Sequence, residues 1–375
     1  MTERRPDPER LLGALGDPEA TEHPWTVDWS AVPDAAALVR AALPARTAFH
    51  TSGSTGRRRR WERTADQLWA EAGLVADLVS ADGRPDAVLA FAPPRHLYGT
   101  IATVLVPARL GVPVHYLPAG ARLPDPGGRR WAVAAIPWTF GILLRRRAWF
   151  DGAARADFVH STAVLPSAAF DLLDAVHARG RAGWLLELFG STETGAVAVR
   201  RRRAGATRDP ADPWTLCADV RFAGPAAGEA PLTVRSPRLA LAEDGAPPPV
   251  WEMDDRVRVT GERTFTFAGR RGRLVNVNGR RLDLDRLEEE LRSALDCADL
   301  ACAPVADAFV GEHFDLLVVP GPGGGPSGTD LRAALDRLGC RPRRVRSVDR
   351  IDRSETGKLR HVQPEPDAPP VRGGQ

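Results

Sequence analysis

The sequence predicts an α/β protein with a large N-terminal domain (1–270) and a small, mobile α+β C-terminal domain (271–375). Short apolar runs alternate with stretches of helical periodicity in the first half of the chain, which is typical of a mostly parallel sheet covered by helices on both faces. Short strands separated by Gly and Pro then indicate a small β-rich subdomain at about 213–268. The glycines and arginines of Gly269–Arg273 mark the boundary.

The predicted elements follow from the spacing of apolar residues. The chain begins with a polar, proline-containing arm to about Pro33. Helical periodicity predicts helices over 35–43, 64–79, 99–110, 168–178 and 331–338, and one that begins near Asp285 as its N-cap. Continuous or alternating apolar runs predict strands over 47–50, 87–91, 112–117, 132–136, 158–164, 184–189, 232–235, 264–267, 314–319 and 345–351.

Composition narrows the possible classes of function. The formal net charge is +3, and the arginine runs are scattered, balanced by 48 acidic residues and free of interleaved aromatic residues, so no nucleic-acid partner is expected. The four cysteines form no CxxC pair, which argues against a zinc site or a disulfide framework. The N-terminus has no apolar h-region, so we expect no secretory signal, and the longest apolar run, Trp131–Leu144, is too short to span a bilayer. We therefore expect a soluble cytoplasmic protein without a membrane partner.

Lys358 is the only lysine among the 51 Lys and Arg residues, and it lies in the segment Ser354–Arg360. An ammonium group is a compact point charge on a flexible stem, and the broad guanidinium fork does not replace it. Lys358 is therefore a candidate functional residue. A single surface lysine retained by chance is the alternative interpretation.

The first stretch whose residues could form a ligand-binding site is Thr51–Gly56, which consists of Thr51, Ser52, Gly53, Ser54, Thr55 and Gly56. Small hydroxylated residues and glycines between a strand and a helix expose N–H groups and hydroxyls that can surround phosphate oxygens. The stretch is not a GxxxxGK[ST] loop, and a flexible surface loop is the alternative. The four arginines Arg57–Arg60 follow directly and either screen phosphate charge or form a solvated face.

A second stretch lies at the end of the strand predicted at 184–189 and comprises Phe189, Gly190, Ser191, Thr192, Glu193, Thr194 and Gly195. Ligands of open α/β sheets bind at the carboxyl ends of the strands. A carboxylate beside a hydroxyl there could hold Mg²⁺ against phosphates. An exposed turn after a buried strand is the alternative.

A third stretch is Trp251–Asp255, with Gly269 and Arg270 further along the chain. A carboxylate can bind both hydroxyls of a ribose, and a guanidinium can bind sugar or phosphate. By itself, an acidic pair next to a strand is usually only a turn.

In this order, the stretches resemble the motifs of the adenylate-forming superfamily of acyl-CoA synthetases, aryl-acid ligases and peptide-synthetase adenylation domains. Two further segments share the resemblance: Asn278–Leu282 and the histidine-bearing Pro94–Gly99. The similarity extends from about residue 47 to 362. It implies a minimal member of that superfamily with a short N-terminus.

The resemblance implies a role for each candidate residue. The loop of Thr51–Gly56 would bind the β- and γ-phosphates of ATP, and Phe189 would pack on the adenine. Gly190 and Ser191 would also belong to the nucleotide-binding residues. Thr192 would contact the α-phosphate and Glu193 would hold Mg²⁺. The remaining roles are ribose binding by Asp255 and Arg270, an acid and thiol entrance lined by His96, and contact with both the carboxylate and the α-phosphate by Lys358.

The implied function is ATP-dependent ligation of an acid to a thiol. A small carboxylic acid would be activated as its acyl-adenylate, and the acyl group would then pass to CoA or to the phosphopantetheine of an acyl carrier protein. Four departures from the family bear on this function: arginines where Pro-Lys usually follows the phosphate loop, Gly272 at the hinge, Asn276 where acyl-CoA ligases often have lysine, and the short N-terminus. A non-catalytic nucleotide-binding or interaction protein on the same fold is the alternative, whereas a Ser-His-Asp hydrolase lacks its G-x-S-x-G elbow.

Overall fold

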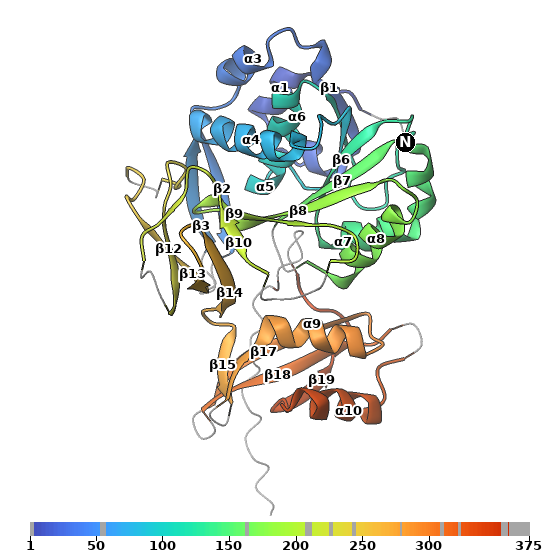
Figure 1. The fold of residues 1–375 in the computed structure, drawn as a ribbon, viewed down its shortest axis with the longest axis vertical. Helices are drawn as coiled ribbons and strands as arrows, with labels where there is room; N and C mark the ends of the chain where they lie inside the picture. The colour runs from blue at the N-terminus through green and yellow to red at the C-terminus, as the bar shows by residue number, and fades with distance from the viewer. Residues whose placement is uncertain are drawn as a thin grey trace, which may run out of the picture. The chain divides into compact units, whose positions relative to one another are not determined.

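The structure is a computed structural model, which describes residues 4–52, 58–161, 165–206, 212–224, 228–241, 245–277, 280–307, 311–321, 324–353 and 359. The chain divides into two compact units, Met1–Ala268 and Gly269–Gln375 (Figure 1). Each unit has a hydrophobic core of its own. Among the described residues, no helix is long and apolar enough to cross a membrane.

The first unit is built on one large sheet, and twelve strands of the described chain contribute to it in the order β1-β5-β4-β6-β7-β8-β9-β10-β14-β13-β12-β11. Their bounds are β1 (Trp25–Asp28), β4 (Ala87–Ala90), β5 (Pro113–Tyr116), β6 (Arg130–Ala135), β7 (Arg155–His160), β8 (Ala182–Ser191), β9 (Gly195–Arg202), β10 (Trp214–Leu216), β11 (Arg221–Phe222), β12 (Glu229–Arg235), β13 (Trp251–Val259) and β14 (Thr264–Arg270). Neighbours from β5 to β8 are parallel, whereas β9 pairs antiparallel with both β8 and β10. The strands of the predicted β-rich subdomain therefore continue the main sheet.

Helices cover both faces of the parallel strands, as the apolar runs predict. Alternate residues of β4 show why: Val88 and Ala90 belong to one buried core, and Ala87 and Leu89 belong to the other. The first face carries α4 (Ala65–Ser80), α5 (Leu97–Gly99), a π-helical segment (Thr100–Leu105) and α6 (Val106–Leu110). The second carries α7 (Pro137–Arg145), a 3₁₀ turn (Arg147–Gly152) and α8 (Ser167–His177). The predicted α/β fold class is confirmed.

The prediction of a polar N-terminal arm is wrong. This segment forms α1 (Pro8–Gly13), α2 (Glu19–Glu22), β1 and a 3₁₀ turn (Trp29–Ala31), followed by α3 (Ala35–Ala42). Strand β1 pairs antiparallel with β5 at the edge of the sheet. Leu12, Trp25 and Trp29 are buried in the core. A few large apolar residues separated by charges and prolines have no periodicity to detect, yet each buries a large area.

The loop predicted between a strand and a helix lies instead within a hairpin of β2 (Arg46–Ser52) and β3 (Arg58–Thr64). Helix α4 begins only after β3, with Thr64 as its N-cap in a capping box with Gln67. Strand β3 was missed because its first residues are a run of arginines. Its inward positions are Trp61 and Arg63, and both are buried.

The second unit begins with a hairpin of β15 (Leu274–Val277) and β16 (Arg280–Asp283), followed by α9 (Leu284–Ala294). It also contains a three-stranded sheet of β17 (Asp299–Asp307), β18 (Gly311–Val319) and β19 (Arg344–Ser347) and the helix α10 (Gly328–Leu338). The N-cap of α9 is Asp283 rather than the predicted Asp285, because the Asp283 carboxylate accepts hydrogen bonds from the N–H groups of Asp285 and Arg286.

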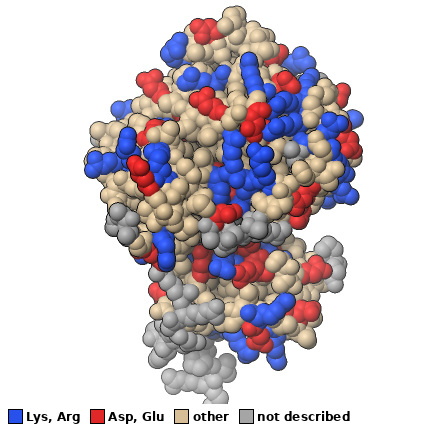
Figure 2. Space-filling model, in the orientation of Figure 1, with Lys and Arg blue, Asp and Glu red and all other residues tan. Residues whose placement is uncertain are grey.

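Acidic and basic side chains are interspersed on the face of the protein shown in Figure 2. This mixture agrees with the small formal net charge of +3.

Candidate active site

The predicted stretch at Phe189–Glu193 lies at the carboxyl end of β8 and continues into the turn to β9. We call Ser191–Gly195 the β8–β9 turn. Ser191 N–H donates to Thr194 Oγ1 (3.1 Å), and Glu193 O accepts from Ala240 N–H (2.8 Å). Thr192 and Glu193 are half-buried. The backbone of the turn is thus held while both side chains keep access to the carboxyl edge of the sheet.

Two glycines allow the backbone to approach its neighbours closely at this turn. A Cβ atom on Gly190 would lie 1.9 Å from Gly195 O, across a β-bulge between β8 and β9. Gly195 has a φ of +68°, and a Cβ there would lie 2.3 Å from Glu71 Oε2. Neither position can carry a side chain without displacing its neighbours.

Arg63 of β3 supports the turn from the protein interior. Its Nη2 and Nε atoms donate to Thr192 O at 2.9 and 3.3 Å. The side chain is fully buried, and burial lowers the pKa of its guanidinium, while the Glu71 carboxylate acts in the opposite direction. The sequence analysis missed both residues, because Arg63 follows a run of arginines and Glu71 has the usual appearance of a charge on a helix.

Phe189 lies in an aromatic cluster on one face of the sheet. Its ring centroid is 5.1 Å from that of Trp214, 5.6 Å from that of Phe265 and 6.1 Å from that of Phe267. The ring is half-buried, so these neighbours fix its orientation while part of it stays accessible. An accessible ring of fixed orientation can stack against a planar base.

The histidine-bearing segment Pro94–Gly99 lies at the same edge of the sheet. The Tyr98 hydroxyl contacts Val159 O of β7 (2.7 Å) and Ala135 O of β6 (3.2 Å), and burial raises the pKa of this hydroxyl. The half-buried His96 is the N-cap of α5. The carboxyl ends of β6, β7 and β8 thus bring this segment and the β8–β9 turn to one edge.

The β2–β3 hairpin, which carries the first residues of the predicted phosphate loop, contacts two of the other candidate stretches. Thr51 and Ser52 are the last residues of β2, whereas Gly53, Ser54, Thr55 and Gly56 lie outside the described residues. On β3, Arg63 contacts the β8–β9 turn, and Trp61 packs edge-on against Trp251 of β13 with 5.2 Å between the ring centroids.

The proposed ribose ligands occupy different parts of the chain. Asp255 lies on β13 and is 7 % exposed. In the order of the sheet, β9, β10 and β14 separate β13 from β8, so strand pairing does not place Asp255 beside the β8–β9 turn. Arg270 is the last residue of β14 and belongs to the second unit.

Lys358 lies outside the described residues, but its described neighbours are anchored within the second unit. Arg353 and Leu359 form an isolated antiparallel bridge. Arg353 Nε and Nη2 donate to the two carboxylate oxygens of Asp299 at 2.7 and 3.0 Å. Asp299 also lies 3.6 Å from Arg292, so two guanidinium groups share this carboxylate.

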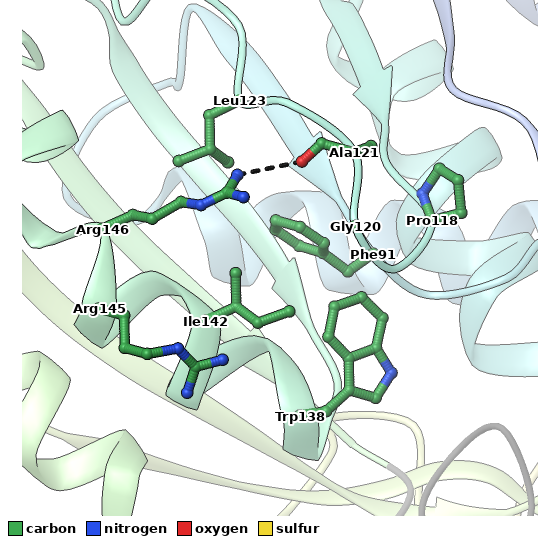
Figure 3. Close-up of a pocket in the computed structure, with 9 residues that line it drawn as sticks. All are labelled: Phe91, Pro118, Gly120, Ala121, Leu123, Trp138, Ile142, Arg145 and Arg146. Carbon is green, nitrogen blue, oxygen red and sulfur yellow. Dashed lines mark hydrogen bonds between the residues drawn. The ribbon is translucent and has the colours of Figure 1, made fainter.

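A cavity of about 160 Å³ opens between α7 and the segment that follows β5 (Figure 3). Phe91 and Trp138 contribute aromatic rings, and the exposed Arg145 and Arg146 lie at the end of α7. None of its lining residues is acidic. Its volume is close to the roughly 150 Å³ of a cavity that holds one benzene ring. None of its lining residues was a candidate in the sequence analysis.

The residues at the β8–β9 turn fit a magnesium ion that is bound together with a nucleotide. Among the described residues, no three His, Cys, Asp or Glu side chains are grouped so that they could hold a metal ion by themselves. Mg²⁺ is commonly bound by one or two carboxylates together with substrate phosphates. A single carboxylate, Glu193, beside the Thr192 hydroxyl agrees with this mode of binding.

Comparison with known proteins shows similarity to ligases of organic acids. No protein-family model matches the sequence. The chain is 29 % identical to the 4-coumarate–CoA ligase of Rhodobacter capsulatus over 257 residues, which covers 66 % of this chain and 58 % of the relative. It is 30 % identical to the corresponding enzyme of Halorhodospira halophila over 236 residues, which covers 62 % and 52 %. The chain thus spans little more than half the length of these curated relatives.

A solved structure of similar fold agrees with these relatives. The anthranilate CoA ligase AuaEII, in complex with anthranoyl-AMP, superposes with a TM-score of 0.64 over 84 % of this chain and 65 % of that protein, at 18 % identity. The fold and the sequence similarities thus agree with the resemblance of this chain to the adenylate-forming superfamily.

Proposed function

We propose that this protein activates a carboxylic acid, aryl or acyl, as its acyl-adenylate and transfers the acyl group to the thiol of CoA or of a carrier protein. The observation that carries the proposal is the β8–β9 turn, which keeps Thr192 and Glu193 at the carboxyl edge of the sheet. The similarity to two 4-coumarate–CoA ligases supports an acid as the substrate.

In the first half-reaction, a carboxylate oxygen of the acid attacks the α-phosphorus of ATP. A bond from that oxygen to phosphorus forms, the bond to the bridging oxygen breaks, and pyrophosphate leaves with the electron pair. The attack brings two anions together, so its rate depends on positioned positive charge. Lys358 is proposed to contact both anions, and Mg²⁺ held by Glu193 would neutralise phosphate charge.

The other candidate residues are proposed to bind the nucleotide. The stretch Thr51–Gly56 would hold the β- and γ-phosphates, and Thr192 the α-phosphate. Phe189 would pack on the adenine, and Asp255 with Arg270 would bind the ribose. In the second half-reaction, a thiol would enter past His96 and attack the acyl carbon, and AMP would leave as the thiol gives up its proton.

Acid-dependent exchange between ATP and labelled pyrophosphate tests the first half-reaction. We expect exchange with at least one member of a panel of aliphatic and aromatic acids, and Lys358→Ala should lower it on the order of 10²–10³-fold. Lys358→Arg keeps the charge but changes its shape, so it should restore little of the exchange. Far-UV circular dichroism checks that both variants are folded.

The possible results of this experiment distinguish failure of the proposed reaction from failure of the role assigned to Lys358. A wild-type protein without exchange for any acid of the panel would contradict the proposed reaction. Normal exchange in Lys358→Ala would contradict only the assigned role. Mass spectrometry of products formed with CoA or with phosphopantetheinylated carrier protein then identifies the acceptor of the acyl group.

A further inference from the structure

A buried cluster of ionised side chains lies behind the β8–β9 turn. Arg63 on β3, Glu71 on α4 and Arg238 in the segment after β12 are 0 %, 4 % and 1 % exposed. Glu71 Oε2 lies 3.6 Å from Arg63 Nη1 and 3.3 Å from Arg238 Nη1. Arg238 also forms a bidentate pair with Asp219, with distances of 2.7 and 3.0 Å. These ion pairs therefore join segments that lie far apart in the sequence.

Each of the three buried side chains also holds backbone of the turn or of the residue after it. Arg63 donates twice to Thr192 O. Glu71 Oε1 accepts from Ala196 N–H at 2.9 Å, and Arg238 Nη2 donates to Ala196 O at 2.6 Å. Arg63 Nη1 in addition donates to Arg238 O, which joins the two arginines directly. The cluster thus forms hydrogen bonds with the backbone both before and after Glu193 in the sequence.

The central contact of this cluster is electrostatic. Glu71 Oε2 and Arg238 Nη1 are buried and lack a hydrogen-bond partner among the described residues, although they face each other at 3.3 Å. Well-packed apolar residues often stabilise a fold as well as a buried ion cluster or better, so such a cluster is weak evidence for a role in stability alone. Its contacts are concentrated on the turn that carries Thr192 and Glu193.

We propose that Arg63, Glu71 and Arg238 are positioning residues for nucleotide binding. They fix the carbonyl groups of Thr192 and Ala196 toward the protein interior, and this fixes the direction in which the Thr192 hydroxyl and the Glu193 carboxylate reach the α-phosphate and its magnesium ion. The inference rests on the proposed function for the identity of the ligand. The positioning of the turn can be tested without any ligand.

The principal test compares Arg63→Lys with a matched control, Arg202→Lys. Arg202 lies on β9 of the same β8–β9 hairpin, is 4 % exposed and pairs with two carboxylates, those of Glu187 (2.5 Å) and Asp212 (2.8 Å), but it is remote from the turn along the strand. Lysine at position 63 cannot donate to Thr192 O and Arg238 O through a planar fork. Both variants should lower the melting temperature by similar amounts.

The proposal predicts that only Arg63→Lys affects the turn. Amide hydrogen exchange in the peptide that contains Ser191–Gly195 should be at least tenfold faster in Arg63→Lys than in the wild type, and unchanged in Arg202→Lys. In pyrophosphate exchange, the KM for ATP should rise at least tenfold in Arg63→Lys, whereas the KM for the acid stays within twofold. Equal behaviour of the two variants in the hydrogen-exchange experiment would overturn the proposal.

Glu71→Gln is the second variant, and it keeps the test decisive if Arg63→Lys does not fold. An amide oxygen can still accept from Ala196 N–H, but the negative charge between the two guanidinium groups is lost. We expect faster hydrogen exchange at the turn, and an unchanged rate would count against the proposal. If the wild type neither binds ATP nor exchanges pyrophosphate, the proposed function fails while the hydrogen-exchange result still decides whether these residues position the turn.

Discussion

Replacement of Gly195 by alanine is expected to destabilise the first unit far more than the same change at Gly180. The two glycines have the same φ of +68°. An alanine in this left-handed conformation costs about 1–2 kcal/mol at either site. At Gly180 no atom lies within 4 Å of the added Cβ, so backbone strain is the whole effect.

At Gly195 the added Cβ would lie 2.3 Å from Glu71 Oε2 and 3.0 Å from Arg238 Nη1. The Glu71 carboxylate must move away, and it then loses its hydrogen bond from Ala196 N–H and its short separation from both arginines. Breaking a buried ion pair costs about 3–5 kcal/mol. We therefore expect Gly195→Ala to lower the free energy of unfolding by about 3 kcal/mol more than Gly180→Ala.

Urea denaturation followed by tryptophan fluorescence measures this difference. All ten tryptophans lie in the first unit, so the signal reports the unfolding of that unit alone. If the two variants differ by less than about 0.5 kcal/mol, a change within the scatter of ordinary surface substitutions, the cluster does not constrain the turn as described.

Three further predictions concern other parts of the fold. Burial alone would raise the pKa of Glu187, but the hydrogen bonds and charges of two arginines on β9 outweigh it and lower this pKa below its ordinary value of 4.5. The contribution of the Glu187 carboxylate to the free energy of unfolding is therefore complete above the unfolded-state pKa and is lost as the pH falls through the lower folded-state pKa. Glu187→Gln should thus cost more stability at pH 7 than at pH 3 in urea titrations. Leu291→Ala in the core of the second unit should lower the free energy of unfolding of that unit by about 2–5 kcal/mol, as measured by circular dichroism. An accompanying shift of the unfolding transition seen by tryptophan fluorescence would show that the two units unfold together. Asp299→Asn removes the carboxylate that holds Arg353, so it should slow pyrophosphate exchange and leave ATP binding by calorimetry unchanged; an equal loss of both would contradict this separation.

The parallel part of the fold could be predicted because its signals are local. Strands β4, β6, β7 and β8 carry buried residues on both faces, so each contains a short apolar run, and the helical period at 99–110 and 168–178 identifies two of the helical stretches that cover them. The β8–β9 turn could be predicted as a candidate site for the same reason. Glycine and hydroxylated residues directly after a buried strand identify the carboxyl edge of the sheet.

The N-terminal segment and β3 could not be predicted in this way. Trp25 and Trp29 are buried among charges and prolines, where no periodicity identifies them. Arg63 is fully buried at the end of an arginine-rich strand, whose arginine run was interpreted either as screening phosphate charge or as a solvated face. Whether an arginine is buried depends on partners supplied by other segments, and these are not visible in its neighbourhood in the sequence.

The sequence by itself determined the strands of the parallel part of the sheet, the motifs at their ends and the superfamily they resemble, because residue period and turn chemistry act over a few neighbouring residues. Only the tertiary structure decided what holds the β8–β9 turn. Arg63, Glu71 and Arg238 come from three separate segments, and a buried charge is tolerated only where the fold brings opposite charges and backbone carbonyl groups to it.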